Sequence, residues 1–327
     1  MRILFITNRY PTKEMQGSSP CIKEQRQAIQ QLGHEVDLLL IHSEQSILNY
    51  LKAVWDVFCT IQLGNSYDLV HAHYGYCGIV ARMQFRCPIV VTYRGSDILS
   101  KRERSVNSLL ARLADRTIVM TEEMKSLLGR DDAYVIPYGV ALDLFKPRPL
   151  PEARRELGLP SDVPLVLFPY DQKRLLKRFD LVEQAVALAR RELPDIRLLV
   201  VHDRPPETVA AYMNACDAMV LASDREGAPM TVREAMACNL PIVSVDVGDV
   251  ASVIGGTDLC YVVNRDPQDI AEKLVRVLRA RRRTNGRSTV EKMSTRCSAA
   301  SVVAVYDSLL QEAGDGGPED PTPEIDP

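Results

Sequence analysis

The sequence lacks the patterns that disulfide-stapled, zinc-binding and membrane-spanning proteins require. Its eight cysteines are scattered and include no C-x-x-C pair, so they fit neither a zinc site nor the framework of a small secreted domain. The apolar run that begins at Arg2 ends at Asn8, too early for a signal peptide, and no run approaches the roughly 18–20 residues that cross a bilayer. We therefore expect reduced thiols and a cytoplasmic protein.

A strong charge of either sign is also missing. The 40 basic residues nearly balance the 43 acidic ones, which leaves a formal charge of −3. This balance gives no pull toward nucleic acid, and we expect no nucleic-acid partner. The proportions are otherwise those of a globular protein, with 46% hydrophobic residues, and 327 residues suggest two domains.

The common nucleotide and hydrolase signatures are absent as well. There is no G-x-G-x-x-G, no G-x-x-x-x-G-K-[ST] and no G-x-S-x-G, which argues against a Rossmann oxidoreductase, a P-loop NTPase and an α/β-hydrolase. No two aspartates stand two residues apart, so the Asp-x-Asp that often holds Mg²⁺ or Mn²⁺ is missing too. Any bound phosphate must therefore be neutralised by protein cations and helix N-termini, and we expect no metal.

Strand-like and helix-like segments do alternate along the chain. Arg2–Thr7 is predicted as a buried strand, Lys23–Leu32 as a helix that ends at Gly33, and Val36–Ile41 as the next strand. Strand, helix and strand in this order form a βαβ unit, which predicts a parallel sheet. Further strands are predicted at 69–73, 89–93, 117–121, 134–137, 165–168, 197–201, 218–221, 241–245 and 261–263, and further helices at 180–193, 206–214, 232–238, 267–283 and 300–312.

A change of amino-acid composition divides the chain. Prolines and glycines crowd the stretch between Pro137 and Pro151, which is typical of a linker. We predict α/β domains over 1–147 and 148–299, a separate helix over 300–312 and a disordered acidic tail over 313–327.

The most informative segment begins at Ser223. A strand ends there, a Gly/Pro loop follows, and a helix opens near Thr231. Ligands of open α/β sheets bind at such strand-to-helix turns, and a helix N-terminus suits a diphosphate. Gly227 removes a side chain where the backbone must approach a ligand. Glu226 and Glu234 bracket the turn and suit sugar and ribose hydroxyls; alternatively, Glu226 is solvated and Glu234 only favours the helix start.

These residues resemble a known element. Glu226 to Glu234 is similar to the Glu-x7-Glu element of the retaining GT-B glycosyltransferases of family 4, and the Glu-Ala-Met-Ala-Cys-x-x-Pro-Ile-Val run typical of that family follows. Further matches, in the family's order, are Leu32-Gly-His-Glu-Val, Tyr67-Asp-Leu-Val-His-Ala-His, Val135-Ile-Pro-Tyr-Gly-Val and Leu144-Phe-Lys-Pro. The resemblance covers nearly the whole folded chain. It implies an α/β protein of the GT-B class, with two Rossmann-like parallel-sheet domains facing across a cleft.

The resemblance also implies an activity. The family transfers a sugar, here of the hexosyl type, from a nucleoside-diphosphate sugar to an acceptor hydroxyl, with retention of configuration and without metal or cofactor. The first domain would bind the acceptor, which could be a glycan, a lipid-linked molecule or a small molecule. The second domain would bind the donor, and the final helix would pack back on the first domain.

Roles for individual residues follow from the same resemblance. Glu226 would contact the transferring sugar and Glu234 the ribose. The donor would lie beside Gly227, Ala228, Pro229, Met230 and Thr231. A basic pair after strand 165–168 would hold the diphosphate: Lys177 matches the family lysine, and Arg174 or Lys173 replaces the family arginine. Cations fixed there stabilise the negative charge that grows as the glycosidic bond breaks.

Three positions depart from the family pattern. Gly17 is the one glycine left where the family has a glycine-rich loop near the donor phosphate, and a plain turn is the alternative. Arg94 replaces a histidine near the reacting sugar, so it would contact phosphate or an anionic acceptor, or the activity is altered. His73 is expected to face the cleft; a structural histidine, or a zinc pair with His71, are the alternatives.

Two regions bear on partners and on activity. The arginine cluster over 276–287 is either a solvated helix face or a contact for anionic lipid head groups, which would place the protein at the inner face of a membrane. Only ten residues, 202–211, stand where relatives have a helix, a loop and a strand, so the second domain is trimmed. A nucleotide-sugar-binding protein without catalysis, and a GT-B epimerase or hydrolase, therefore remain as rival functions.

Overall fold

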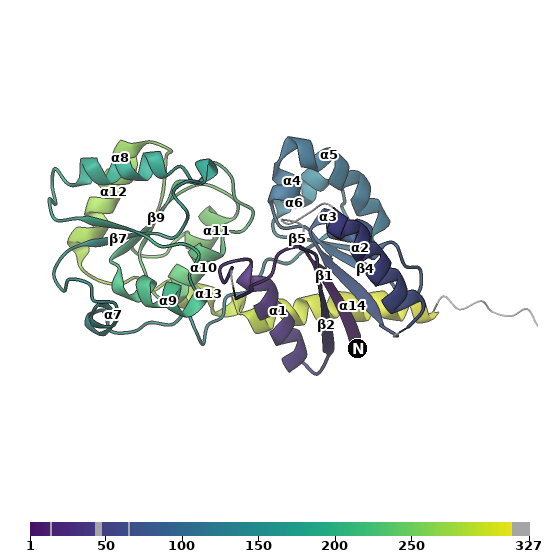
Figure 1. Ribbon diagram of the computed structural model, residues 1–327. Coiled ribbons are helices and arrows are strands. Elements are labelled where there is room, and N and C mark those ends of the chain that lie inside the picture. The colour runs from purple at the N-terminus through teal and green to yellow at the C-terminus, as the bar shows by residue number, and fades with distance from the viewer. Residues whose placement is uncertain (14, 43–47, 65, 316–327) are drawn as a thin grey trace, which may run out of the picture.

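The computed structural model of the protein describes residues 1–13, 15–42, 48–64 and 66–315, which form two α/β domains lying side by side (Figure 1). Within these residues the first sheet has six parallel strands in the order β2-β1-β3-β4-β5-β6. The strands are β1 (Arg2–Thr7), β2 (Glu35–Leu40), β3 (Leu69–His73), β4 (Ile89–Thr92), β5 (Arg116–Val119) and β6 (Tyr134–Val135).

The second sheet is also parallel throughout. Its five strands, counted over the same residues, follow the order β11-β10-β9-β7-β8. They are β7 (Leu165–Phe168), β8 (Arg197–Val200), β9 (Ala218–Leu221), β10 (Ile242–Val245) and β11 (Cys260–Val263). The predicted fold class, two Rossmann-like parallel-sheet domains, is confirmed.

Helices cover both faces of each sheet, which is why most strands read as continuous apolar runs. The helices of the first domain are α1 (Pro20–Gln31), α2 (Leu48–Val57), η1 (Phe58–Gln62), α3 (Gly75–Ala81), α4 (Ser96–Leu99), α5 (Lys101–Leu110), η2 (Ala111–Leu113) and α6 (Glu122–Leu128). Those that follow are α7 (Leu150–Glu156), η3 (Leu175–Lys177), α8 (Phe179–Ala189), α9 (Pro206–Ala215), α10 (Met230–Ala237), α11 (Val250–Ile254), α12 (Pro267–Ala280), α13 (Arg287–Val290), η4 (Glu291–Met293) and α14 (Thr295–Asp315).

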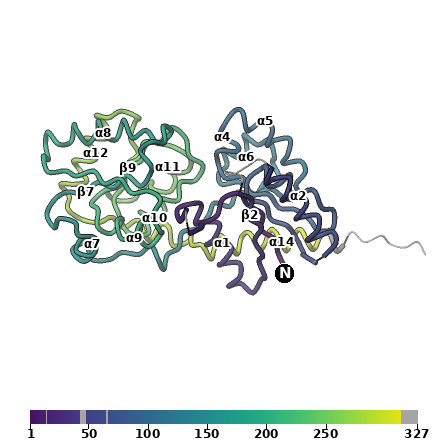
Figure 2. Tube along the Cα trace, in the orientation of Figure 1, coloured from purple at the N-terminus to yellow at the C-terminus, as the bar shows by residue number. Residues whose placement is uncertain are grey.

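The chain crosses between the domains twice, and the two crossings touch (Figure 2). Val140 on the way out forms a parallel bridge with Ser294 on the way back, and the Val140 amide donates to the Met293 carbonyl at 2.9 Å. A Cβ on Gly139 would stand 2.2 Å from the Ser294 carbonyl oxygen, so only glycine fits there. After the return crossing, α14 packs against α1 of the first domain.

Several element ends differ from the sequence-based prediction. Helix α14 begins at Thr295 rather than at residue 300, because the Ser294 hydroxyl accepts from the Cys297 amide and caps the first turn. It continues to Asp315, so residues 313–315 are helical rather than part of a tail. The rest of the predicted tail, 316–327, lies outside the described residues. The end of the proline-rich stretch is also helical: α7 opens with Leu150 and Pro151, and proline is compatible with a first helical turn.

Candidate active site at the domain interface

The candidate site lies at the point in each sheet where the order of the strands reverses. In the second sheet, β8 and β9 lie on opposite sides of β7, so the loops after β7 and β9 diverge and leave a crevice at the carboxyl ends of the strands. In the first sheet the same change occurs between β1 and β3. The loop after β7 carries Tyr170 and leads into η3, and the loop after β9 carries Glu226 and leads into α10. Both predicted catalytic segments thus lie at the same edge of the second sheet.

A lysine, a glutamate and a tyrosine form a cluster at this edge of the second sheet. Lys177 Nζ forms an ion pair with Glu226 Oε1, and both side chains are largely buried. The same Nζ lies 3.6 Å from the centroid of the Tyr170 ring, a cation–π contact. The Tyr170 hydroxyl in turn lies 2.5 Å from the Thr231 hydroxyl at the start of α10. Tyr170 therefore links the lysine to the N-terminus of α10, a role for which the sequence pattern gives no signal.

Burial sets the electrostatics of this cluster. It lowers the pKa of Lys177 from its usual range, while the Glu226 carboxylate opposes the shift by favouring the ammonium. Burial also raises the pKa of Tyr170 well above its usual range, with Glu226 adding to the effect, so the phenol stays neutral. The cluster thus holds a buried cation beside a neutral tyrosine whose hydroxyl is engaged by Thr231.

The N-terminus of α10 adds a second source of positive potential. Its N-cap residue is Pro229, whose side chain accepts no hydrogen bond from the first turn. The Val232 amide donates to the Pro229 carbonyl at 3.1 Å, no side chain caps the turn, and the helix dipole favours an anion there. Glu234, one turn further on, lies on the same helix.

A cleft of about 550 Å³ opens between the two domains at this helix. Its lining from the first domain includes Arg9 and Gly17, and its lining from the second includes Arg174, Thr231 and Glu234. The cleft is wide enough for a drug-sized or nucleotide-sized ligand. Its lining also includes Arg204, and the aspartates Asp171 and Asp203 lie in it beside the cations.

The two candidates for the family arginine are placed differently. Arg174 lines the cleft, whereas Lys173 is exposed and absent from its lining. The Asp171 carboxylate accepts from the Lys173 amide at 2.9 Å, which fixes the turn that directs Lys173 outward. Gly17 lies on the opposite wall, where its amide approaches the Asp203 carboxylate at 3.4 Å across the domain boundary.

Glu234 is electrostatically unusual for a surface carboxyl. Burial raises its pKa to about 8, and Glu24 on α1 of the other domain adds repulsion. Burial likewise raises the pKa of Glu24 to about 7, with Glu207 as a further repulsive charge. Glu234 is therefore largely protonated at neutral pH, and a neutral carboxyl can both donate to and accept from a hydroxyl.

The structure gives a reason for glycine at position 227 besides close approach to a ligand. A Cβ at this position would stand 2.9 Å from the Arg94 carbonyl oxygen and 3.5 Å from the Gly95 Cα, both of the first domain. Close approach of the two domains excludes a side chain here, and the approach of a ligand to Gly227 stays a prediction. Next to this contact, Ala228 and Met230 pack against the core of the first domain.

Glu226 and Glu234 do not share one cleft. Glu226 lines a second, smaller cleft of about 390 Å³, together with Arg104, Arg225, Gly248 and Arg265. Arg225 also crosses the boundary, where its Nη1 donates to the Leu99 carbonyl at 3.2 Å. The carboxylates that the resemblance assigns to a single donor thus face two separate openings.

Arg94 is the centre of an aromatic cluster in the first domain. Its guanidinium lies over the rings of Tyr74 and Tyr138, at 5.0 and 4.8 Å from their centroids, and Nη1 donates to the Tyr74 hydroxyl at 2.6 Å. Its Nε is buried without a hydrogen-bond partner. Nη2 contacts the Cys21 sulfur at 2.7 Å. A buried guanidinium held by neutral groups is suited to an anion, but Arg94 lines neither of the clefts described above.

The two histidines of β3 lie beneath this cluster. His73 is fully buried rather than facing a cleft, and its Nδ1 lies 2.9 Å from the Tyr138 hydroxyl. Burial lowers its pKa well below the usual range. Both ring nitrogens of His71 have partners, the hydroxyls of Tyr306 and Thr92. Within the part of the chain that the structure describes, no group of three or more metal-binding side chains comes together.

Two members of the arginine cluster over 276–287 are engaged inside the second domain. Arg283 donates to three carbonyls, and Arg287 does the same further along. Both therefore bind backbone carbonyls inside the second domain, including those at the C-terminal ends of α9 and α10. The exposed members Arg279 and Arg282 form ion pairs with Glu192 and Asp258.

Comparison with known families agrees with this architecture. Residues 15–144 match the family model described as Glycosyltransferase Family 4. Residues 183–280 match the model described as Glycosyl transferases group 1. The first match lies in the first domain, and the second contains the β9–α10 segment with Glu226 and Glu234.

Relatives of named activity share part of the chain. A Bacillus subtilis protein named as a teichuronic acid biosynthesis glycosyltransferase, TuaC, is 30% identical over 238 residues, covering 64% of this chain and 61% of TuaC. A D-inositol 3-phosphate glycosyltransferase of Nocardiopsis dassonvillei is 27% identical over 268 residues, covering 65% of this chain and 62% of the relative. The chain thus spans about three fifths of the length of these relatives.

Solved structures share the fold over nearly the whole chain. Sucrose-phosphate synthase from Thermosynechococcus elongatus superposes with a TM-score of 0.77 at 19% identity, covering 95% of this chain and 100% of that one. Anabaena Alr3699/HepE in complex with UDP-glucose superposes with a TM-score of 0.66 at 17% identity, covering 96% and 100%. Sequence matches in both domains and a shared two-domain fold agree: the chain belongs to glycosyltransferase family 4 and has the GT-B fold.

Proposed function

We propose that the protein transfers a hexosyl-type sugar from a nucleoside-diphosphate sugar to a hydroxyl of its acceptor, with retention of configuration and without a metal ion. The observation that carries this proposal is the Tyr170 link: Lys177 Nζ lies over its ring and Thr231, at the start of α10, contacts its hydroxyl. Tyr170 therefore brings the lysine close to the N-terminus of α10. An anionic leaving group is the ligand that such a pair stabilises.

The chemistry follows from charge development. As the glycosidic bond breaks, negative charge grows on the diphosphate, and Lys177, Arg174 and the first turn of α10 stabilise it more in the transition state than in the ground state. The sugar becomes positively charged in the same step, and the Glu226 carboxylate would stabilise that charge. Fixed protein cations supply the role that a metal plays elsewhere, so the proposal needs none.

The comparisons suggest which donor and which acceptor to test first. UDP-glucose is the first donor to test, since the HepE structure contains it. An acceptor with a phosphate is the first acceptor class to test, because a relative is named for D-inositol 3-phosphate and because Arg94 offers a buried cation. A lipid-linked acceptor would bring the protein to the inner face of a membrane.

One observation favours a second candidate, a protein that binds nucleotide sugars without transferring them. Glu226 is already neutralised by Lys177 and opens into a different cleft from Glu234. A donor held in the larger cleft could then lie out of reach of Glu226. A GT-B hydrolase or epimerase is the third candidate, distinguished by turnover without an acceptor.

Three measurements on the full chain separate these functions. Thermal shift with UDP-glucose, UDP-N-acetylglucosamine and GDP-mannose identifies the donor, and transfer to phosphorylated and unphosphorylated polyol acceptors follows with and without EDTA. Proton NMR of the product gives its anomeric configuration. We expect transfer, an unchanged anomer and no effect of EDTA. Binding without turnover would favour the second candidate, turnover without acceptor the third, and no binding of any nucleotide sugar would contradict all three.

A further inference from the structure

An apolar surface on the first domain has no role in the proposed site. Helix α2 buries Ala53 and Val57 but leaves Leu51 and Trp55 exposed at 67% and 64%. These two residues line a groove of about 320 Å³ with Val54, Phe58 and Met83, so the exposed apolar atoms are contiguous. The Trp55 and Phe58 rings are stacked with centroids 6.2 Å apart. A soluble domain rarely leaves so many large apolar side chains together without a partner.

The surface extends over the neighbouring helices. Helix α3 packs against both α2 and α5, and all three lie on the side of the sheet away from α1 and α14 (Figure 1). Other exposed large hydrophobic residues on these elements and their loops are Leu63, Tyr76, Ile79, Phe85, Val106, Leu109 and Leu113. We call the whole set, with the groove residues Leu51, Trp55, Phe58 and Met83, the α2–α3–α5 face.

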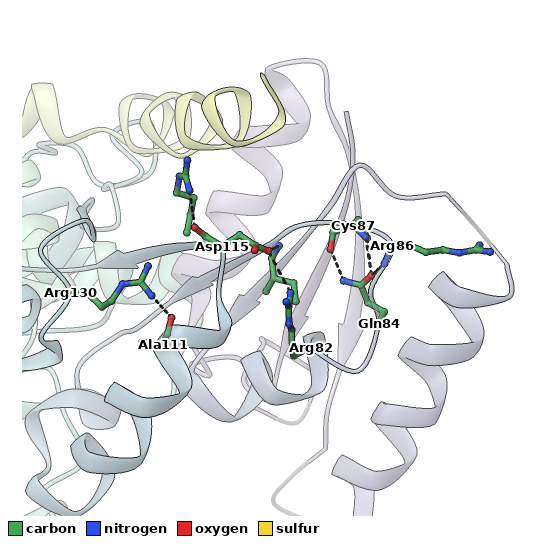
Figure 3. A network of polar contacts seen from close by, with 9 residues as sticks. Arg82, Gln84, Arg86, Cys87, Ala111, Asp115 and Arg130 are labelled. Atoms are coloured by element: carbon green, nitrogen blue, oxygen red, sulfur yellow. Dashed lines mark hydrogen bonds and ion pairs between the residues drawn. The ribbon is translucent and has the colours of Figure 1, made fainter. Parts of the chain in front are cut away.

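Hydrogen bonds fix the loop that carries Phe85, the most exposed member of this face. The buried Gln84 side chain donates to the Cys87 carbonyl at 2.7 Å and accepts from the Arg86 and Cys87 amides at 2.8 and 3.0 Å (Figure 3). This closes the loop after α3 and leaves Phe85 at 78% exposure. Arg86 extends away from Gln84, and its guanidinium donates to the Ile61 carbonyl. The loop therefore presents an aromatic ring next to a cation.

The three helices of this face and the loop after α3 are rich in basic residues. The stretches 48–57, 75–87 and 101–113 contain seven lysines and arginines against two acidic residues, whereas the whole chain carries a formal charge of −3. The basic residues are Lys52, Arg82, Arg86, Lys101, Arg102, Arg104 and Arg112. Arg82 pairs with Asp115 and Arg104 lines the smaller cleft, which leaves five basic residues in these stretches for the face itself, on a chain of net negative charge.

We propose that the α2–α3–α5 face docks on the surface of an anionic membrane. Tryptophan, phenylalanine and leucine side chains insert at the headgroup level, and lysines and arginines around them attract anionic headgroups. Self-association through the same face is disfavoured, because a two-fold interface would place one positive patch against another. None of the helices in the described residues is long and apolar enough to cross a bilayer, so the contact stays on the surface. The docking does not depend on the proposed transfer reaction.

The chain carries its own probe for the test. Trp55 is the only tryptophan in the sequence, so its fluorescence reports this face alone. We expect a blue shift when the full chain is titrated with vesicles of equal parts phosphatidylglycerol and phosphatidylcholine. Pure phosphatidylcholine vesicles should give at least tenfold weaker binding, and 0.5 M NaCl should weaken the anionic-vesicle binding because it screens the headgroup charge.

Two double variants distinguish the electrostatic contribution to membrane binding from the apolar one, and both retain Trp55 as the probe. Lys101→Glu with Arg102→Glu should weaken binding to the anionic vesicles at least tenfold, at about 1 kcal/mol per surface charge. Phe58→Ser with Phe85→Ser should do so too, with unchanged circular dichroism showing that the fold is kept. The matched control is Arg155→Glu with Arg191→Glu, which changes charge equally on exposed residues of the other domain and should bind like wild type.

Clear outcomes would overturn the proposal. These are the absence of a blue shift, equal binding to both vesicle types, and equal losses in the control variant. A blue shift that depends on protein concentration without vesicles would instead assign the face to a second copy of the chain.

Discussion

Gly227 of the second domain lies so close to Arg94 of the first that a Cβ would stand 2.9 Å from the Arg94 carbonyl oxygen. The two loops that carry Glu226 and Arg94 therefore meet backbone to backbone. Gly248 presses on Gly227 from the other side: a Cβ on Gly248 would be 1.9 Å from the Gly227 carbonyl oxygen. Neither loop can retreat easily, so the domains close through a contact that only glycine permits.

Substituting this glycine should therefore separate the domains. In Gly227→Ala the new methyl group must displace backbone, and overpacking of this kind costs about 1–3 kcal/mol when it cannot relax. We expect most of it to be relieved by opening of the interface, with kcat/KM for transfer falling at least tenfold and the thermal midpoint changing little. Steady-state kinetics and thermal denaturation measure both. Wild-type kinetics in the alanine variant would show that the enzyme does not work through this closed contact.

Tyr170 should matter through its ring and its hydroxyl separately. Tyr170→Phe keeps the ring beneath Lys177 but loses the contact with Thr231, which we expect to cost about 1 kcal/mol of transition-state stabilisation. Tyr170→Leu also loses the cation–π contact and should cost about 2 kcal/mol more. Thr231→Val is the matched partner, and in a double-mutant cycle with Tyr170→Phe the two effects should not add. Additive effects would mean that the two hydroxyls act independently.

Stability should depend on pH through the pair Glu24 and Glu234. Their folded pKa values of about 7 and 8 lie above the ordinary 4.5, so the folded state holds more protons than the unfolded state over this interval. Stability should therefore fall as pH rises from about 4.5 to 8 and level off above that. Glu24→Gln should raise the free energy of unfolding at pH 8 by about 1 kcal/mol, since solvent still screens part of the repulsion between the two partly buried groups.

Thermal denaturation at several pH values tests this directly. Glu24→Gln should match wild type at pH 4, where both carboxyls are protonated, and exceed it by about 2–4 °C at pH 8. Glu183→Gln, an exposed change on α8, serves as the control and should leave the profile unchanged. A variant equally stabilised at both pH values would rule out repulsion between the two carboxyls as the cause.

Arg283 should contribute far more to stability than its neighbours in the same sequence cluster. Its guanidinium donates to the Cys216, Met213 and Cys238 carbonyls at 2.6, 2.7 and 3.3 Å. Arg283→Met leaves these acceptors unpaired and should lower the free energy of unfolding by about 2–4 kcal/mol. Arg279→Met, which removes only an exposed ion pair with Glu192, should change it by less than about 1 kcal/mol. Chemical denaturation of both variants compares them, and equal losses would contradict the assignment.

The strands were the most predictable part of the fold. Leu165–Phe168 and Ala218–Leu221 are found in the structure with the predicted bounds, because parallel strands covered on both faces are uninterrupted apolar runs. The pattern gives no comparable signal for α2, because Leu51 and Trp55 place apolar side chains on its exposed side and blur the periodicity that marks a core helix.

The parts of the site that follow a sequence motif were predictable, whereas the parts that depend on the tertiary fold were not. Lys177 and Glu226, 49 residues apart, are brought together as the resemblance implies. Nothing in the sequence marks the role of Tyr170, because that role depends on its contact with Lys177 at the end of η3. The burial of His73 and the carbonyl contacts of Arg283 were also invisible, since both follow from how distant segments pack rather than from local sequence.

The central claim, that Lys177 stabilises charge on a departing nucleoside diphosphate, is tested most directly by the transfer rate of Lys177→Met with the donor that stabilises the wild-type protein. Lys177 is largely buried against Tyr170 and Glu226, so methionine fills its space without its charge. Loss of one such group typically slows the chemical step by about 10²–10³-fold. We predict a loss of that size in kcat, with the thermal midpoint of the Lys177→Met/Glu226→Gln double variant close to that of wild type. A Lys177→Met enzyme that transfers sugar at the wild-type rate would contradict the account.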